Sequence, residues 1–293
     1  MKGPQRLVQR FGDELWTIFS HVDRRSFLRY CASIARHAPA ILRTRKLAPA
    51  DEAMAPREIQ VRFGRAALRL PGEHFGLVRE ILCRQVYQRL PGFEPGPGQL
   101  VLDLGANVGV FSVSAAAAGA RVVAVEAQVG FVRELERIAS WNRVADRVKA
   151  IHALVGETTG VFASSEERRR ASHMFDEEPP VLTVEEVMEM ASIDRVSLMK
   201  IDVEGSEFAL FDGETSWLER VDRVVLEVHA DYGRPPAIIA ALQDGGFATQ
   251  VFDSAGQASE ASDERDCFVF AQRRRPGSTP GDQPRRTAPA ASR

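Results

Sequence analysis

The sequence predicts an α/β fold in which helices cover both faces of a mainly parallel sheet. From about residue 100 onward, short apolar runs alternate with segments of helical periodicity, which is typical of strand–helix units. The first apolar run leads directly into a turn of small residues and then into a helix. At 293 residues the chain is long enough for one such domain with extensions, whereas two large domains would be crowded.

The composition is that of an ordinary globular protein, and it excludes several classes. A formal net charge of -2 gives no electrostatic argument for binding nucleic acid. No apolar run approaches the roughly 20 residues that span a bilayer, so we expect no transmembrane segment. Cys31, Cys83 and Cys267 are too widely spaced for a CxxC metal site or a disulfide framework, which favours a reducing, cytoplasmic environment.

Residues 1–57 are expected to form a helical extension followed by a linker. Apolar residues recur at helical spacing over residues 7–22 and again over residues 27–35. These amphipathic stretches could pack on the protein's own core, lie on a membrane surface or mediate self-association. Two prolines mark residues 47–57 as a linker.

Residues 58–99 are expected to form a small hairpin and a helix ahead of the main domain. Alternating apolar residues between 59 and 70, with a turn at Gly64, predict the hairpin, and a helix is expected over residues 73–90. The main domain then spans residues 100–272. The tail, residues 273–293, has too few apolar side chains to offset the entropy of ordering it, so we expect it to be disordered.

Within the main domain, each element follows from a local pattern of apolar residues. Strands are expected at residues 100–104, 121–126, 148–154, 198–201, 223–228 and 267–271. Helices are expected at residues 108–118, 131–143, 184–190, 208–211 and 236–244. The polar segment 158–180 and the N-terminal extension are least constrained by the fold, so we expect them to influence substrate choice.

The run VLDLGANVG at residues 101–109 predicts a cofactor-binding turn. Gly105 permits a tight turn, and Gly109 allows the start of the helix to pack closely. Unsatisfied amides at the helix N-terminus would suit a carboxylate or a phosphate. The expected cofactor contacts in this run are Asp103, Gly105, Ala106, Asn107 and Gly109.

The spacing of this turn favours a nucleoside with an amino-acid group over a dinucleotide. A dinucleotide turn would read G-x-G-x-x-G, but Asn107 and Val110 occupy the second and third glycine positions. Asp103 would repel pyrophosphate, whereas it could pair with the ammonium of a methionine group. Glu126 ends the second strand, where an acidic side chain can accept the hydroxyls of an adenosine ribose. The pattern therefore indicates a nucleoside cofactor that carries an amino-acid group and disfavours an NAD-dependent dehydrogenase.

Acidic residues and one histidine follow two later strands. Asp202 and Glu204 come after the strand that ends at residue 201, and Glu227 and His229 end the next one. Ligands bind at the carboxyl edge of open α/β sheets, so these side chains are expected at the site. Asp202 and Glu204 would point to opposite faces of an extended strand, but Gly205 permits a turn that could bring them together.

These residues suggest how a proton could be removed from an acceptor. His229 is the candidate general base because imidazole titrates near neutral pH, with Asp202 or Glu227 orienting it or holding acceptor hydroxyls. The carboxylates could instead hold Mg²⁺, which would acidify the hydroxyl, although we assign no metal ligands.

Lys200 lies directly before the first acidic residues, and two interpretations are open. A cation beside Asp202, Glu204 and Glu207 would offset their mutual repulsion in a crowded acidic site. Alternatively, Lys200 is a solvated lysine of the strand. We favour the first interpretation.

The sequence resembles the FkbM family of methyltransferases. The resemblance rests on DLGANVG at residues 103–109, on Glu126, and above all on KIDVEGSE at residues 200–207, and it continues through EVH at residues 227–229. It implies a Rossmann-like class I methyltransferase fold, whose seven-stranded sheet has one antiparallel strand, and S-adenosylmethionine as the methyl donor. It also implies O-methylation, frequently of a sugar hydroxyl on a glycan, glycolipid or natural product.

The sequence departs from the family pattern at two places. Gln128 stands where the family usually has proline, and Val184 and Glu185 replace the usual Leu-Asp after Thr183. The expected partner is a small-molecule or glycan acceptor. The alternative is a noncatalytic cofactor-binding or scaffolding protein with this fold, but the presence of both cofactor carboxylates and the acidic edge argues against it.

Overall fold

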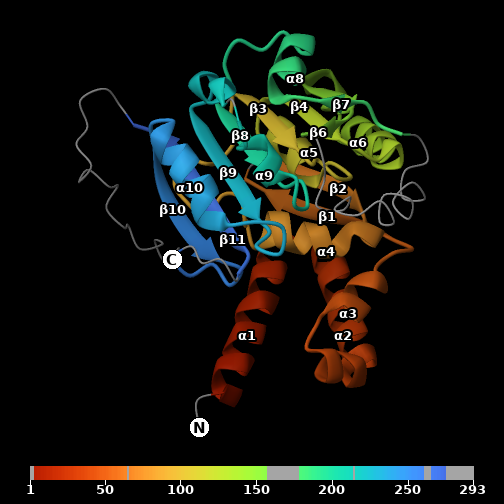
Figure 1. The fold of residues 1–293 in the computed structure, drawn as a ribbon. Coiled ribbons are helices and arrows are strands. Elements are labelled where there is room, and N and C mark those ends of the chain that lie inside the picture. The colour runs from red at the N-terminus through yellow and green to blue at the C-terminus, as the bar shows by residue number, and fades with distance from the viewer. Residues whose placement is uncertain (1–2, 65, 157–177, 214, 261–264, 275–293) are drawn as a thin grey trace.

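The computed structural model describes residues 3–64, 66–156, 178–213, 215–260 and 265–274. Most of the polar segment 158–180 and the tail beyond residue 274 lie outside the described residues, so the expectations for them are not addressed by the structure. The described chain forms a layered α/β body from which two N-terminal helices project (Figure 1).

One seven-stranded sheet forms the centre of the protein, in the order β10-β11-β9-β8-β3-β4-β5. Its strands are β3 (Leu100–Leu104), β4 (Arg121–Glu126), β5 (Val148–His152), β8 (Leu198–Ile201), β9 (Arg223–Val228), β10 (Phe247–Asp253) and β11 (Cys267–Arg273). β11 pairs antiparallel with β9 and β10, while β9, β8, β3, β4 and β5 pair in parallel. The predicted fold class, with its single antiparallel strand, is confirmed.

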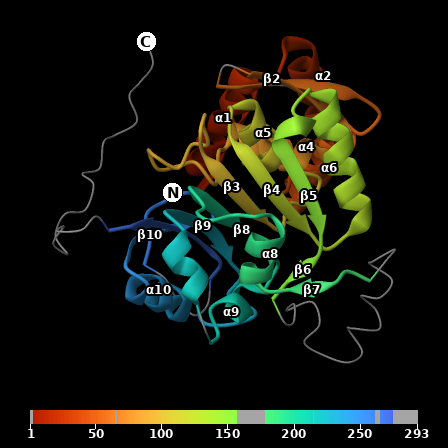
Figure 2. The same ribbon diagram turned by 90° about the horizontal axis from the view of Figure 1, so that it is seen from above.

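Helices cover both faces of this sheet, as Figure 2 shows. α5 (Val110–Ala117) and α6 (Val129–Trp141) lie on one side, and α8 (Val184–Met190), α9 (Glu207–Leu210) and α10 (Pro235–Asp244) lie on the other. Successive strand residues point to opposite faces, so Val101 belongs to one hydrophobic cluster and Leu102 to the other. Short 3-10 turns, Ala145–Arg147 and Ser216–Arg220, precede β5 and β9.

Four details of the sheet differ from the sequence predictions. β10 was not expected, because all but its first residue are at least partly exposed and polar side chains break up the apolar pattern. The predicted strand 148–154 is divided, since β6 (Leu154–Val155) leaves the main sheet and pairs with β7 (Val181–Leu182), which was not predicted. β11 continues to Arg273, whose guanidinium donates to the Val221 carbonyl at 2.9 Å, so the tail cannot begin at residue 273.

The N-terminal extension is helical, as predicted. It comprises α1 (Gly3–His21), α2 (Arg24–Thr44) and α3 (Ala48–Glu52), followed by the hairpin of β1 (Glu58–Phe63) and β2 (Ala66–Pro71). None of the described helices combines the length and apolar content needed to cross a membrane.

Residues 47–57 are packed against the protein rather than forming an open linker. α3 lies in this segment, where Ala50 and Met54 are buried and Asp51 accepts a hydrogen bond from the Tyr30 hydroxyl at 2.8 Å. Pro49 does not mark a linker, because it lies in the first turn of α3, where a missing N–H costs nothing.

The helix predicted over residues 73–90 is shorter and irregular. It consists of a 3-10 turn (Gly72–His74), α4 (Phe75–Val78) and a π-helical turn (Arg79–Cys83). The chain then leaves the helix, and Gln85 adopts a left-handed φ of 51°. This exit brings the following residues to the carboxyl edge of the sheet.

Candidate active site

The glycine turn between β3 and α5 packs tightly against the chain itself. Gly105 has a φ of 75°, and a Cβ there would lie 1.7 Å from the backbone oxygen of Asp202. Gly109 has a φ of 81°, and its Cβ would meet the Leu135 side chain of α6 at 2.4 Å. Besides its predicted place in the tight turn and at the cofactor, Gly105 joins this turn to the Asp202 loop.

The amides of this turn already have partners within the chain. Those of Gly105 and Ala106 both donate to the Val125 carbonyl at 3.0 Å, and the Gly109 amide donates to the Ala106 carbonyl. The Val108 amide donates to Oδ1 of Asn107 at 2.7 Å. These four amides are therefore already engaged, and anion binding by the first amides of α5 stays a prediction.

Glu126 links the first two strand ends. Its Oε2 accepts from the Asn107 amide and its Oε1 from the Gln128 amide, each at 2.8 Å. Burial raises the pKa of Glu126, and these two hydrogen bonds partly oppose the shift. The bond from Gln128 depends on the departure from the family pattern, because proline has no N–H to donate. Each carboxylate oxygen can accept a further hydrogen bond, so Glu126 can still bind hydroxyl groups.

Asp103 and Lys200 form a fully buried ion pair beneath the turn. Asp103 has no exposed surface, and Lys200 is 2% exposed. The Lys200 Nζ lies 3.1 Å from Oδ1 of Asp103 and 3.6 Å from Oδ2 of Asp202, and it donates to the Gly105 carbonyl at 2.7 Å. The Ser112 hydroxyl donates to the other Asp103 oxygen at 2.6 Å. Burial lowers the pKa of Lys200, but the two carboxylates raise it more, so the lysine stays charged.

This geometry corrects two expectations. Lys200 is not a solvated strand lysine, and of the three carboxylates assigned to it, only Asp202 pairs with it. In the described contacts, one oxygen of Asp103 faces Lys200 and the other faces Ser112. Direct pairing of Asp103 with a cofactor ammonium therefore stays a prediction.

Glu207 joins the turn after β8 to the end of β9. It is fully buried, and its Oε1 accepts from the His229 amide at 2.6 Å and lies 3.0 Å from His229 Nδ1. Its Oε2 accepts from the Gly205 amide at 2.8 Å. Sequence analysis named Glu207 only as a neighbour of Lys200, but the structure gives it the role of holding the histidine.

The turn after β8 brings the acidic residues together. Glu204 has a φ of 50° and Gly205 one of 99°, so the chain reverses and does not continue as a strand. Asp202, Glu204 and His229 then place side-chain donor atoms within 4.8 Å of one another. The convergence that sequence analysis left open is realised. Two carboxylates and an imidazole are a donor set that a divalent cation can use.

Tyr87 completes this acidic cluster, and sequence analysis missed it. Its hydroxyl donates to Oδ2 of Asp202 at 2.7 Å and lies 3.4 Å from Oε2 of Glu227. The Lys200 Nζ lies 5.2 Å from its ring centroid. Burial raises the pKa of Tyr87 well above its usual value, and the neighbouring carboxylates add to the shift. No motif surrounds Tyr87, and the only signal was a polar aromatic residue beside apolar neighbours.

Charge and burial shift the protonation of the two residues at the end of β9. Burial raises the pKa of Glu227 to about 8, and Asp202 adds to this shift. Burial lowers the pKa of His229, but its hydrogen bond to Glu207 and the nearby carboxylates raise it to about 9. At neutral pH His229 is therefore mainly an imidazolium and Glu227 mainly a carboxylic acid, so the assignment of either residue as a general base stays a prediction.

We expect the stability of the protein to fall as the pH rises from about 6.5 to 9. The His229 pKa rises on folding from 6.5 to about 9, so its stabilising contribution is complete below pH 6.5 and is lost as the pH rises through 9. The Glu227 pKa rises from 4.5 to about 8, so its contribution is complete below pH 4.5 and is lost through pH 8.

Melting temperatures between about pH 6 and pH 10 measure this effect. Glu227→Gln cannot ionise, so this variant should show a shallower pH dependence and melt above the wild type at the alkaline end. Wild-type melting temperatures that stay constant over this range would rule out both shifts.

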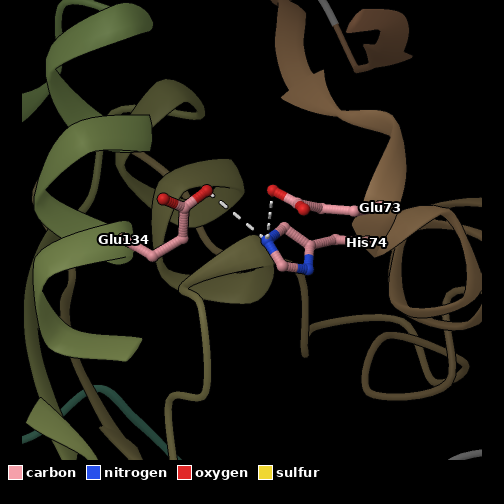
Figure 3. Close-up of side chains that lie close together, drawn as sticks. All are labelled: Glu73, His74 and Glu134. Carbon is pink, nitrogen blue, oxygen red and sulfur yellow. Dashed lines mark ion pairs between the residues drawn. The ribbon is translucent and has the colours of Figure 1, made fainter. Parts of the chain in front are cut away.

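Glu73, His74 and Glu134 form a second cluster of titratable groups (Figure 3). His74 Nε2 is 3.4 Å from Oε1 of Glu134 and 3.8 Å from Oε1 of Glu73. Glu134 also accepts from Arg137 Nε at 2.6 Å, which lowers the pKa of its carboxyl group. Because Arg137 already engages this carboxylate, we interpret the cluster as a set of structural polar contacts that joins the end of the hairpin to α6.

A cavity of about 370 Å³ lies at the opposite edge of the sheet. It is lined by residues at the amino ends of three parallel strands, including Leu100, Arg121 and Val148. None of the predicted site residues lines it. The predicted site residues instead converge at the carboxyl edge.

The chain matches one family model and is similar to known proteins. Residues 103–249 match the family model described as the methyltransferase FkbM domain. The chain is 27% identical over 252 residues to the AMB antimetabolite synthetase AmbE of Pseudomonas aeruginosa. The aligned region covers 68% of this chain but only 11% of that much longer protein.

Solved methyltransferase structures are similar to this chain at lower sequence identity. A precorrin-6y C5,15-methyltransferase from Geobacter metallireducens has 12% identity and a TM-score of 0.40, over 64% of this chain and 85% of that one. The METTL16 methyltransferase domain has 10% identity and a TM-score of 0.44, over 67% of each chain. Because the family match spans half of the chain and contains both the glycine turn and the acidic cluster, the protein belongs to the FkbM family of methyltransferases.

Proposed function

We propose that the protein is an S-adenosylmethionine-dependent O-methyltransferase that acts on a hydroxyl of a sugar or another small molecule. The observation that supports this best is the cluster of Asp202, Glu204, Glu227 and His229 directly beside the cofactor turn. Carboxylates can hold acceptor hydroxyls and accept a proton, and Lys200 connects the two sites through Gly105 and Asp202.

The residues of the turn fit the cofactor. Glu126 would accept the ribose hydroxyls, and Gly105, Ala106, Asn107 and Gly109 would form the surface against which the cofactor lies. We propose that Asp103 acts mainly through Lys200, which holds the Gly105 carbonyl in place. When bound, the cofactor supplies an electrophilic methyl group, so positioning of the acceptor oxygen provides much of the rate.

We propose that Glu227 accepts the proton from the acceptor hydroxyl. With a bound cofactor supplying the methyl group, the Glu227 carboxylate would take up the proton that the acceptor hydroxyl loses. A base works best when its pKa lies near the operating pH, and Glu227 is closer to this range than the imidazolium of His229. His229 would then orient Glu204 and lower the pKa of Glu227 by its positive charge.

Mg²⁺ dependence is a second candidate for activating the hydroxyl. His229 Nδ1 is held by Glu207, so Nε2 faces Glu204, which is an arrangement common among metal-binding histidines. Loss of turnover with a chelator and recovery with Mg²⁺ would favour this route over proton transfer to Glu227 alone.

The acceptor class is the least constrained part of the proposal. The curated relative is named as an antimetabolite synthetase, which supports a small-molecule acceptor, but this chain spans 11% of its length. A screen that transfers a radiolabelled methyl group to glycans, glycolipids and phenolic metabolites tests the proposal. Label found only on nitrogen, carbon or nucleic acid would contradict O-methylation, and cofactor binding without transfer to any acceptor would favour the noncatalytic alternative.

Glu126→Gln is expected to weaken binding of S-adenosylhomocysteine by about 1–3 kcal/mol. The amide keeps the shape of the carboxylate but loses the charge that strengthens hydrogen bonds to hydroxyl groups. Calorimetry gives the affinity, and the melting temperature of each variant checks its fold. Glu136→Gln, at an exposed position on α6, is the matched control. Unchanged affinity in a folded Glu126→Gln variant would remove this residue from the cofactor site.

A further inference from the structure

Large apolar side chains are exposed on the two projecting N-terminal helices. Of the eight large hydrophobic residues exposed in the described chain, five lie on α1 and α2: Phe11, Trp16, Phe19, Leu28 and Leu42. Trp16 is 68% exposed, Leu28 67% and Leu42 77%. Figure 1 shows both helices extending from one end of the α/β body. We call these five residues and the two helices that bear them the arm surface.

The charge of α2 is entirely positive. The helix contains Arg24, Arg25, Arg29, Arg36 and Arg43, and no aspartate or glutamate. None of these arginines forms an ion pair within the part of the chain that the structure describes. The whole protein has a net charge of -2, so this helix is a local exception. Five unpaired guanidinium groups beside exposed apolar residues favour a partner that is both anionic and apolar.

Helical spacing separates the faces of α2. Arg25, Arg29, Arg36 and Arg43 are spaced by four and then seven residues, which places them along one stripe of the helix. Leu28 and Leu42 are fourteen residues apart and share a second stripe next to it. The buried residues Ser26, Tyr30 and Ser33 lie on the opposite side, toward the protein. A basic stripe beside an exposed apolar stripe is typical of helices that lie in a membrane interface.

The same charges disfavour a second copy of the chain as the occupant. In a twofold contact the same patch meets itself, so a dimer across α2 would bring the arginines of one copy toward those of the other. An anionic lipid surface instead accepts the apolar side chains among its acyl chains and the arginines among its headgroups. The composition of the arm surface matches this partner.

We propose that α1 and α2 dock the protein on an anionic lipid surface. The arm surface is joined to the acidic cluster by a short path. Glu14 of α1 pairs with Arg79 at 2.5 Å, and the chain runs from Arg79 to Tyr87, which donates to Asp202. The docking itself does not depend on the proposed O-methylation.

Cosedimentation of the full chain with vesicles tests this proposal. We expect binding to vesicles that contain phosphatidylglycerol and little binding to vesicles of phosphatidylcholine alone. Added salt should weaken the binding, because each basic residue near such a surface contributes roughly fivefold to the affinity at low ionic strength. A triple variant, Arg25→Glu, Arg29→Glu and Arg36→Glu, should therefore bind at least about a hundredfold more weakly.

Apolar variants and matched controls separate insertion from simple charge attraction. Trp16→Ser together with Leu42→Ser should also reduce binding at least tenfold, whereas Met190→Ser and Arg133→Glu, at exposed positions on the body, should not. Melting temperature and S-adenosylhomocysteine affinity verify that each variant is folded. Equal binding to both kinds of vesicle, or no binding to either, would overturn the proposal. A second result would also overturn it: the wild-type protein does not bind vesicles but forms a dimer in light scattering, and the Trp16→Ser and Leu42→Ser variant is a monomer.

Discussion

Lys200→Met is expected to lower the free energy of unfolding by about 3–5 kcal/mol, because it leaves a buried carboxylate without its cation. The lysine ammonium is the positive partner of Asp103, which is fully buried, and it also lies near Asp202. Methionine fills a similar volume, so lost packing contributes little. The Gly105 carbonyl also loses its hydrogen bond, and the cofactor turn should loosen with it.

Denaturant unfolding measures this change, and two further variants define its cause. Asp103→Asn combined with Lys200→Met should recover much of the lost stability, since neither charge then remains. Lys149→Met changes an exposed strand lysine and should stay within about 0.5 kcal/mol of the wild type. A Lys200→Met protein as stable as the wild type would show that the buried pair contributes no net stability.

Glu227→Gln is expected to reduce methyl transfer by about 10²–10⁴ while leaving cofactor affinity nearly unchanged. The amide keeps the size of the side chain but cannot accept the hydroxyl proton. Glu227 ends β9 beside Tyr87 and Asp202, whereas the cofactor turn follows β3, so turnover and binding should separate. Single-turnover transfer of a labelled methyl group, with the acceptor found in the screen, gives the rate.

The pH profile of kcat/KM then distinguishes Glu227 from His229 as the base. If Glu227 is the base, the acidic limb should lie near pH 8 in the wild type and disappear in Glu227→Gln. His229→Gln should keep this limb but shift it to higher pH, because the positive charge that lowers the Glu227 pKa is gone. Loss of the limb in His229→Gln, with full activity of Glu227→Gln, would restore His229 as the base. Glu136→Gln is again the matched control.

Local patterns in the sequence were sufficient for most of the sheet. β3, β4, β8 and β9 begin and end at the predicted residues, because each is a buried apolar run bounded by polar or small residues. β10 escaped prediction because an exposed edge strand does not need an apolar pattern. α3 escaped because a proline in the first turn of a helix looks the same in sequence as a proline in a linker.

The sequence by itself determined the fold class and the residues that gather at its carboxyl edge. Parallel strands end at one edge, so a motif at the end of each strand is enough to place Asp103, Glu126, Asp202 and Glu227 in one region. The family resemblance then identified the kind of chemistry.

Only the tertiary structure decided which of these groups are paired, buried or charged. Lys200 pairs with Asp103 and Asp202, Glu207 holds His229, and Tyr87 reaches Asp202 from a segment far earlier in the chain. Protonation depends on burial and on charges within a few ångströms, and neither is encoded in local spacing. The proposal that Glu227 rather than His229 is the base therefore rests on the packing of the strand ends and not on the motif.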